Sequence, residues 1–135
     1  LLFIASLDKD INKAQIIYRK NNLYNVEILN APCQADATKL IDQYFNIYHN
    51  ALEYCLPLPP ESSYKYIFSF MKNKDYKKAF IDEWIGSKNF NLGERDKPEM
   101  QLCFGYEKPP NFFLNNKYFH ELSIKLYKPL IESLL

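Results

Sequence analysis

Four lysines stand close together in the sequence and are the first candidates for a chemical role. They are Lys72, Lys74, Lys77 and Lys78, with the aromatic Tyr76 among them. Lysine ammonium groups contact phosphate oxygens, and a handful of such contacts adds a salt-dependent term to nucleic-acid binding. The spacing predicts a DNA-binding patch at a turn between two helices. A solvated helix surface is the alternative explanation of the same residues.

Arg95 and Lys97 form a second, smaller basic candidate for contact with DNA. Glu94 and Asp96 alternate with them in the sequence, so an ordinary surface with local ion pairs is the alternative. The net charge of the whole chain is only +1. Any binding to nucleic acid must therefore come from a local patch of this kind.

Residues that bind metals or attack substrates form no recognisable motif. The two histidines and three cysteines are scattered, and His49 and Cys55, six positions apart, cannot share one helix face. The three glycines never approach the spacing of a phosphate-binding loop. Ser62 and Ser63 have neither the flanking glycines nor the histidine partner of a hydrolase. We therefore expect no metal, no cofactor and no catalytic residue.

The composition predicts a folded domain with one core. The chain has 135 residues, of which 47% are hydrophobic and 24% charged. Its longest apolar runs are far shorter than the roughly 18 residues that a membrane span requires. The cysteines Cys33, Cys55 and Cys103 are odd in number and far apart, which favours a reducing cytoplasm over a disulfide framework.

The start of the sequence has the features of a cut within a longer protein. Residues Leu1–Ile4 include no initiator methionine and open no signal peptide. We expect the chain to be a piece of a larger subunit. The bias towards Lys, Asn, Ile, Tyr and Phe indicates an AT-rich genome.

The positions of these candidates depend on the elements that carry them, and the first elements are strands within residues 1–31. Gln15–Lys20 and Leu23–Leu29 are rich in β-branched and aromatic residues. Asn21 and Asn22 between them tolerate the positive φ of a tight turn, so an antiparallel hairpin is predicted.

A long amphipathic helix is predicted over residues 34–55, because the hydrophobic period changes there to 3.6. Its apolar face comprises Ala37, Leu40, Ile41, Tyr44, Ile47, Tyr48, Ala51 and Leu52. The proline-rich segment Leu56–Pro60 ends this helix and must be extended.

The remaining part, residues 62–135, is expected to be helical. Ser62 or Ser63 is predicted to cap a helix that ends near Met71. A second helix is expected from about Asp75 until Gly86, followed by a loop over residues 87–95.

Two further helices are predicted towards the end of the chain. Asp96 is expected to cap one that contains Pro98 in its first turn and runs to Gly105. In the last helix Pro129 is expected to introduce a kink. The apolar stripe of that helix comprises Phe119, Leu122, Leu126, Leu130 and Leu134.

These segments together predict an α+β fold in a single domain over residues 1–135. A small antiparallel sheet in residues 1–31 would pack on the long helix over 34–55, and the helical part over 62–135 would follow.

Five short segments follow one another in a distinctive order and spacing over most of the chain. The segments are Ala37–Tyr44, Leu56–Ser63, Ala79–Gly86, Gly93–Pro98 and Leu126–Leu130. This succession resembles the C-terminal domain of the exodeoxyribonuclease V gamma subunit, the RecC family.

The resemblance implies a noncatalytic subunit of the RecBCD-type helicase–nuclease, which acts in double-strand-break repair and recombination. Such a subunit has no ATPase of its own, holds the motor subunits together and helps to split the DNA duplex. The implied partners are DNA within the complex and the beta and alpha subunits (RecB and RecD). The resemblance also implies a PD-(D/E)XK nuclease-like core that has lost its catalytic residues.

The loss of catalytic residues can be tested on the predicted hairpin. An active core needs an acid on one strand and a (D/E)-x-K triplet on the next, because the carboxylates hold a divalent cation and the lysine assists at the phosphate. Gln15 falls near the first acidic position. The second strand offers Glu27–Leu29 or Ile28–Asn30, neither of which contains lysine. Asp8 and Asp10 belong to a turn, so an inactive domain is predicted.

Two alternatives to this interpretation remain. One is an active nuclease whose lysine has moved to a helix, for which Lys39 is the candidate. The other is a protein-interaction domain that never touches DNA. The exposed strand edge also predicts self-association of this piece. The apolar residues expected to drive it include Leu1, Phe3, Ile16 and Tyr18.

Overall fold

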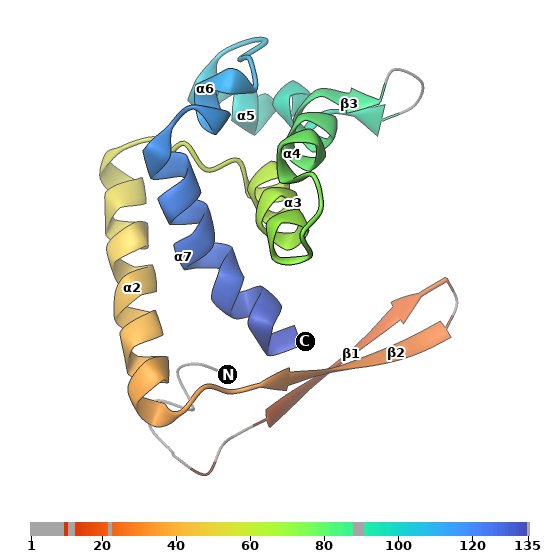
Figure 1. The fold of residues 1–135 in the computed structure, drawn as a ribbon, viewed down its shortest axis with the longest axis vertical. Coiled ribbons are helices and arrows are strands. Elements are labelled where there is room, and N and C mark those ends of the chain that lie inside the picture. Colours follow the sequence, from red (N-terminus) through yellow and green to blue (C-terminus); the bar gives the residue numbers. More distant parts are fainter. Residues whose placement is uncertain (1–9, 11–12, 22, 88–90, 135) are drawn as a thin grey trace. The chain divides into compact units, whose positions relative to one another are not determined.

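The computed structural model describes residues 10, 13–21, 23–87 and 91–134. They fall into two compact units, one comprising residues up to His49 together with those from Pro129, and the other Asn50–Lys128. The described part is α+β and mostly helical, as predicted (Figure 1). None of the described helices has both the length and the apolar composition needed to cross a membrane.

The predicted hairpin is confirmed. Strands β1 (Lys13–Lys20) and β2 (Leu23–Asn30) pair antiparallel, and Asn21 at the turn has a φ of 51°. Its described side chains are exposed or half-buried on both faces, so the expected packing of this sheet on the long helix is not seen among the described residues. Leu1 and Phe3 of the predicted sticky surface lie outside the described residues.

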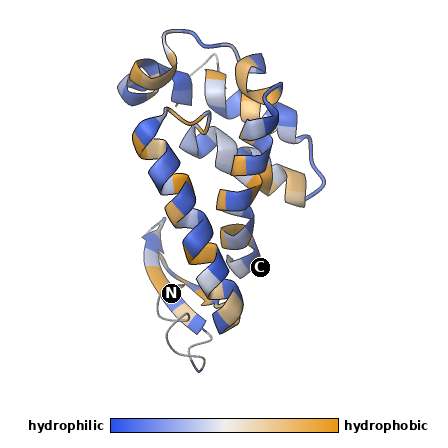
Figure 2. Cartoon of the chain, turned by 90° about the vertical axis from the view of Figure 1, so that its left-hand side faces the viewer, coloured by the Kyte–Doolittle hydropathy of each residue, from blue (hydrophilic) through white to orange (hydrophobic). Residues whose placement is uncertain are grey.

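The long helix is confirmed as α2 (Gln34–Glu53), but little of its predicted apolar face is buried. Ala37 alone among its described side chains is buried. Tyr48 and Leu52 on that face are 58% and 65% exposed, and the neighbouring Phe45 is 61% exposed. In Figure 2, where α2 faces the viewer, hydrophobic residues recur along the helix between hydrophilic ones. Helical periodicity predicted the helix here, but not what covers it.

The first helix after the prolines, α3 (Pro60–Met71), begins earlier than predicted. Its N-cap is Pro59, and Ser62 and Ser63 lie inside the first turn, completely buried. The predicted serine cap is therefore wrong. A proline fits the first helical position, since its missing N–H would have no partner there.

The next helix, α4 (Tyr76–Ile85), packs against α3 and has the predicted ends. The Asp75 carboxylate accepts a hydrogen bond from the Lys78 backbone N–H at 3.0 Å, and Gly86 ends the helix with a φ of 79°. The predicted loop over residues 87–95 is partly wrong. It contains a miniature antiparallel pair, β3 (Gly86–Ser87) and β4 (Asn91–Leu92), and a 3-10 turn, η1 (Glu94–Asp96).

The last helices are α5 (Pro98–Phe104), α6 (Asn111–Leu114) and α7 (Lys117–Leu134). Helix α5 ends before Gly105 as predicted, but its N-cap is Lys97. Asp96 instead accepts a hydrogen bond from the Gly93 backbone N–H at 3.0 Å, so the predicted Asp96 cap is wrong. Pro129 lies inside α7.

Aromatic side chains form the core of the Asn50–Lys128 unit. Phe80, Trp84, Phe113 and Phe119 are almost completely buried. The ring centroids of Trp84 and Phe113 are 4.9 Å apart, and those of Phe80 and Phe119 are 5.2 Å apart. Edge-to-face ring pairs at such distances contribute beyond the area that they bury. The indole N–H of Trp84 donates to the Lys108 carbonyl at 2.7 Å, so the one polar atom of that side chain is also satisfied.

Candidate nucleic-acid interface

The turn between α3 and α4 is held in one conformation by its backbone hydrogen bonds. The Lys74 N–H donates to the Ser69 carbonyl at 2.9 Å, and the Asn73 N–H donates to the Phe70 carbonyl at 3.1 Å. Asn73 between these bonds has a φ of 52°, so the turn is a Schellman motif with Asn in the left-handed position. The lysines of the candidate patch therefore project from a defined backbone.

All four lysines of the cluster, Lys72, Lys74, Lys77 and Lys78, are exposed. The Lys72 ammonium lies 4.6 Å from the centre of the Phe68 ring, a cation–π contact. Within the part of the chain that the structure describes, the other three side chains form no ion pair. The nearest acid in sequence, Asp75, has its carboxylate on the α4 N-terminus. The cluster is therefore available to an external anion.

The second basic candidate has a different environment. The Lys97 ammonium lies 2.7 Å from Glu61 Oε1. The Glu61 carboxylate accepts its hydrogen bond and so raises the pKa of Lys97, with smaller contributions from nearby acids. The Arg95 Nε lies 3.6 Å from the carboxylate of Asp96. Both cations are thus engaged in ion pairs, of which only that of Arg95 with Asp96 joins residues that are neighbours in sequence.

The structure does not bring the two basic candidates together. Lys97 is tied to Glu61 in the first turn of α3, whereas Lys72 caps the other end of that helix. Eleven residues separate the two ends, which at the rise of an α-helix is roughly 16 Å. The lysine cluster is therefore the better candidate interface, and Arg95 and Lys97 belong to a different structural feature.

That feature is centred on Glu94, which was expected from the sequence only to neutralise the charges of Arg95 and Lys97. Glu94 is 2% exposed, and its two carboxylate oxygens accept hydrogen bonds from the backbone N–H groups of Glu61 and Ser62 at 2.8 and 2.7 Å. The carboxylate thus satisfies free donors at the start of α3 and meets the positive end of the helix dipole. One feature of the sequence could have indicated this role: the proline-rich segment before α3 offers no side chain that could cap the helix.

Gly93 allows this capping loop to approach α4. A Cβ at this position would lie 2.3 Å from the backbone carbon of Ile85 and 2.4 Å from the Trp84 carbonyl oxygen. Any larger residue would force the loop away from the helix.

Tyr127 lies near the Glu94 carboxylate. Burial, and secondarily the charge of Glu94, raise the pKa of this phenol to about 12.

The residues considered for nuclease chemistry lie on two elements: Gln15 and Glu27 on the exposed hairpin, and Lys39 on α2. Gln15 is paired with Ile28, and Glu27 with Ile16. The phenol of Tyr18 donates to Glu27 Oε1 at 2.6 Å. Among the described residues, no group of three or more His, Cys, Asp or Glu side chains could hold a metal ion. Asp8 lies outside the described residues.

Lys39, the candidate for a displaced catalytic lysine, is an exposed residue of α2. Its ammonium lies 3.6 Å from the carboxylate of Asp36, one helical turn earlier. This ion pair is the usual i,i+3 arrangement on a helix surface.

Comparison of the chain with protein-family models, with curated proteins and with solved structures finds no match.

Proposed function

We propose that this chain is a noncatalytic scaffold and DNA-handling domain of a RecBCD-type helicase–nuclease, related to the C-terminal domain of the RecC family. The observation that carries the DNA-handling part is the lysine cluster on the α3–α4 turn, with three exposed ammonium groups free of ion pairs among the described residues. A DNA backbone supplies the closely spaced anions that such a cluster fits.

The contacts between motif segments support the proposed relationship. The Glu94 carboxylate binds the backbone of Glu61 and Ser62, and Lys97 pairs with the Glu61 side chain. The segments Leu56–Ser63 and Gly93–Pro98, which carry part of the resemblance, are thus joined through their own polar groups. A functional unit made of both segments gives a physical reason for finding them together.

Exposed apolar residues support the scaffold part of the proposal. Phe45, Tyr48 and Leu52 of α2 and Ile17 and Val26 of the hairpin are each more than half exposed. Apolar residues left open in this way are typical of surfaces that bind other proteins. The beta and alpha subunits (RecB and RecD) are the partners proposed for them, in a bacterial cytoplasm.

The hairpin is proposed to be the remnant of a PD-(D/E)XK nuclease-like core. In support, Gln15 replaces the first acid, and no frame of β2 combines an acid with the correctly spaced lysine. The domain then needs neither a metal ion nor a nucleotide, and other subunits perform the chemistry.

The proposal is tested by DNA binding and cleavage with the purified chain. Fluorescence anisotropy with a labelled duplex should give an affinity whose logarithm falls linearly with the logarithm of salt concentration. Addition of magnesium or manganese should produce no cleavage. Absence of binding at low salt would favour the protein-interaction alternative, and metal-dependent cleavage that is lost in Lys39→Ala would favour the active nuclease.

A further inference from the structure

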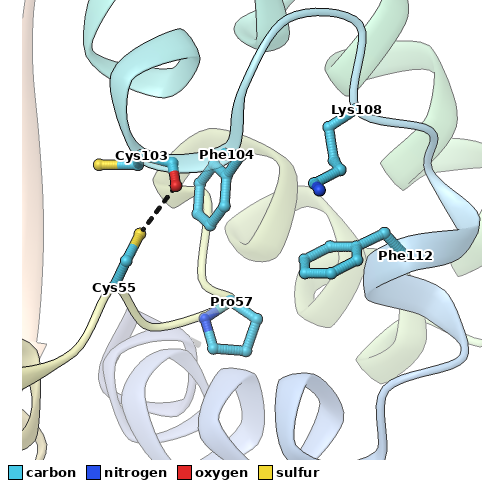
Figure 3. Close-up of a pocket in the computed structure, with 6 residues that line it drawn as sticks. All are labelled: Cys55, Pro57, Cys103, Phe104, Lys108 and Phe112. Atoms are coloured by element: carbon cyan, nitrogen blue, oxygen red, sulfur yellow. Dashed lines mark hydrogen bonds between the residues drawn. The ribbon is translucent and has the colours of Figure 1, made fainter.

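Two cysteines that are far apart in the sequence meet at one small pocket. Cys55 follows the end of α2, and Cys103 lies in the last turn of α5. Both are free and exposed. The pocket has a volume of about 180 Å³, and both sulfur atoms lie at its left-hand edge in Figure 3. It is lined by Cys55, Pro57, Cys103, Phe104, Lys108 and Phe112.

The two residues are in direct contact. The Cys55 thiol donates to the Cys103 carbonyl oxygen at 3.5 Å, although 48 positions separate the two in sequence. Partial burial, a hydrogen bond with the Cys103 side chain and the charge of that side chain together raise the pKa of Cys55 to about 11. The thiols therefore act on each other as well as on the backbone. A disulfide requires such proximity, because its two Cα atoms must lie within about 7 Å.

We propose that Cys55 and Cys103 are a redox-sensitive pair, which closes to an intramolecular disulfide when a low-molecular-weight disulfide such as oxidised glutathione is present. This inference is independent of the proposed DNA-handling function. The proposed disulfide is a covalent modification within the Asn50–Lys128 unit. A reducing cytoplasm keeps both cysteines as thiols, and oxidising conditions convert them to the disulfide.

The chemistry proceeds by two thiol–disulfide exchanges. The Cys103 thiolate attacks one sulfur of oxidised glutathione, so that a mixed disulfide forms and one glutathione thiolate leaves. Cys55 then loses its proton to solvent and attacks the Cys103 sulfur, which releases the second glutathione thiolate, and the two released thiolates take up the two protons given up by the cysteines. Overall, two protein thiols are oxidised to a disulfide and one glutathione disulfide is reduced to two thiols. The first attack falls to Cys103 because the raised pKa of Cys55 keeps that thiol protonated at neutral pH.

The bond would join two segments that lie far apart in the sequence. Cys55 precedes the proline-rich segment that leads into α3, and Cys103 lies in the last turn of α5, which follows the Glu94 capping loop. Closure across 48 positions restricts the unfolded chain and so stabilises the folded unit. Cys33 provides an internal comparison, because its thiol donates to the Asp36 carboxylate at 3.1 Å within its own helix start.

Mass spectrometry of the purified chain after treatment with oxidised glutathione tests the proposal. We expect a product that has lost two hydrogen atoms, and a proteolytic peptide pair linking Cys55 to Cys103. The melting temperature should rise by about 5 °C or more and return on reduction. The variant Cys33→Ser should behave in the same way. Cys55→Ser and Cys103→Ser should give only open glutathione adducts with no rise in melting temperature.

Three results would overturn the proposal. One is a wild-type chain that accumulates glutathione adducts without an internal link. Another is a link that involves Cys33 as often as the other two cysteines. The third is a link between Cys55 and Cys103 that lowers the melting temperature, because the folded unit would then not hold the two thiols ready for closure.

Discussion

At the scale of single residues, the buried acid Glu94 contributes more to the fold than the basic residues near it in the sequence. Glu94 accepts two backbone hydrogen bonds at the start of α3, in place of the serine cap that the sequence predicted. Arg95 and Lys97, which follow Glu94 in the sequence, form ion pairs with Asp96 and Glu61. The charged groups of the Gly93–Pro98 segment are therefore engaged in contacts within the protein, and Glu94 among them caps the start of α3.

Replacement of Glu94 should weaken folding in proportion to the acceptors lost. Glu94→Ala should lower the free energy of unfolding by about 3 kcal/mol, because the part-buried N–H of Glu61 and the buried N–H of Ser62 lose their partner. Glu94→Gln keeps one acceptor oxygen and should lose about half as much. Urea unfolding measures both, with the exposed Glu99→Gln as a control that stays within about 0.5 kcal/mol. Equal stability of Glu94→Ala and the unchanged chain would contradict the capping role.

Tyr127 should make the domain sensitive to alkaline pH. Its pKa is raised from 10.0 to about 12, mainly by burial, so the folded chain holds the phenol proton where the unfolded chain has released it. This contribution is fully present below pH 10 and is lost as pH rises to about 12. At 1.36 kcal/mol per pKa unit, the loss is about 3 kcal/mol.

Urea unfolding at pH 9 and pH 11.5 measures the contribution of Tyr127. In Tyr127→Phe the decrease between the two pH values should be smaller, because this phenol no longer titrates. An identical decrease in both proteins would show that other groups cause the alkaline loss.

At the scale of elements, local signals predicted the helices, but contacts between distant segments determined how they begin. The turn between α3 and α4, the start of α4 near Asp75 and the glycines after α4 and α5 were predicted because residue choice is restricted at such helix ends. The true start of α3 was not, since its cap is a side chain 32 positions away from Ser62. Nor was the miniature strand pair in the loop, whose strands have only two residues each.

The same contrast applies to the candidate site. Four lysines within seven positions led to the predicted patch, and the structure leaves them exposed, while their contact with DNA stays a prediction. Arg95 and Lys97 were predicted as a second basic candidate. The ion pair of Lys97 with Glu61, in the first turn of α3, could not be predicted because the two residues are far apart in sequence. The contact of Cys55 with Cys103 had no signal at all in the sequence, because nothing in a spacing of 48 residues indicates proximity.

The left-handed conformation of Asn73 gives a prediction about the α3–α4 turn. Asn73→Gly should leave the stability unchanged or raise it slightly, whereas Asn73→Ala should cost about 1 kcal/mol, because a Cβ without a compensating polar group is disfavoured at a φ of 52°. Thermal unfolding followed by circular dichroism distinguishes the two. An alanine variant as stable as the glycine variant would mean that the turn does not require this backbone conformation.

At the scale of the whole molecule, two kinds of surface stand out in the described residues. One is the lysine cluster of the α3–α4 turn, and the other consists of apolar residues on α2 and on both faces of the hairpin. The nearly balanced charge of the chain makes both local features rather than consequences of composition. Together they suit a domain that contacts DNA and protein partners at different places.

The apolar hairpin should make the isolated chain associate with itself. Ile17 and Val26 are directly paired across the strands and are 65% and 57% exposed. Light scattering should show an average mass that rises with protein concentration. The double variant Ile17→Lys and Val26→Lys should stay monomeric, because charges on an exposed strand oppose pairing with another chain. A control pair of lysines at the exposed Asn46 and Asn50 should leave the association intact.

A strictly monomeric wild-type chain at high concentration would contradict this prediction. The prediction would also be contradicted if both lysine pairs reduced the association equally, because general charge repulsion would then explain the effect.

The most direct test of the central claim is the salt dependence of DNA binding in a lysine-cluster variant. Lys74, Lys77 and Lys78 are replaced by alanine, and a control variant carries alanine at the exposed Lys13, Lys39 and Lys117, so that both lose the same charge. We expect the cluster variant to bind all duplex sequences more weakly. Its plot of log affinity against log salt should be shallower by up to about 0.9 for each lost phosphate contact, while the control keeps the original slope. An unchanged slope in the cluster variant, or an equal change in both, would contradict the claim that this turn contacts DNA.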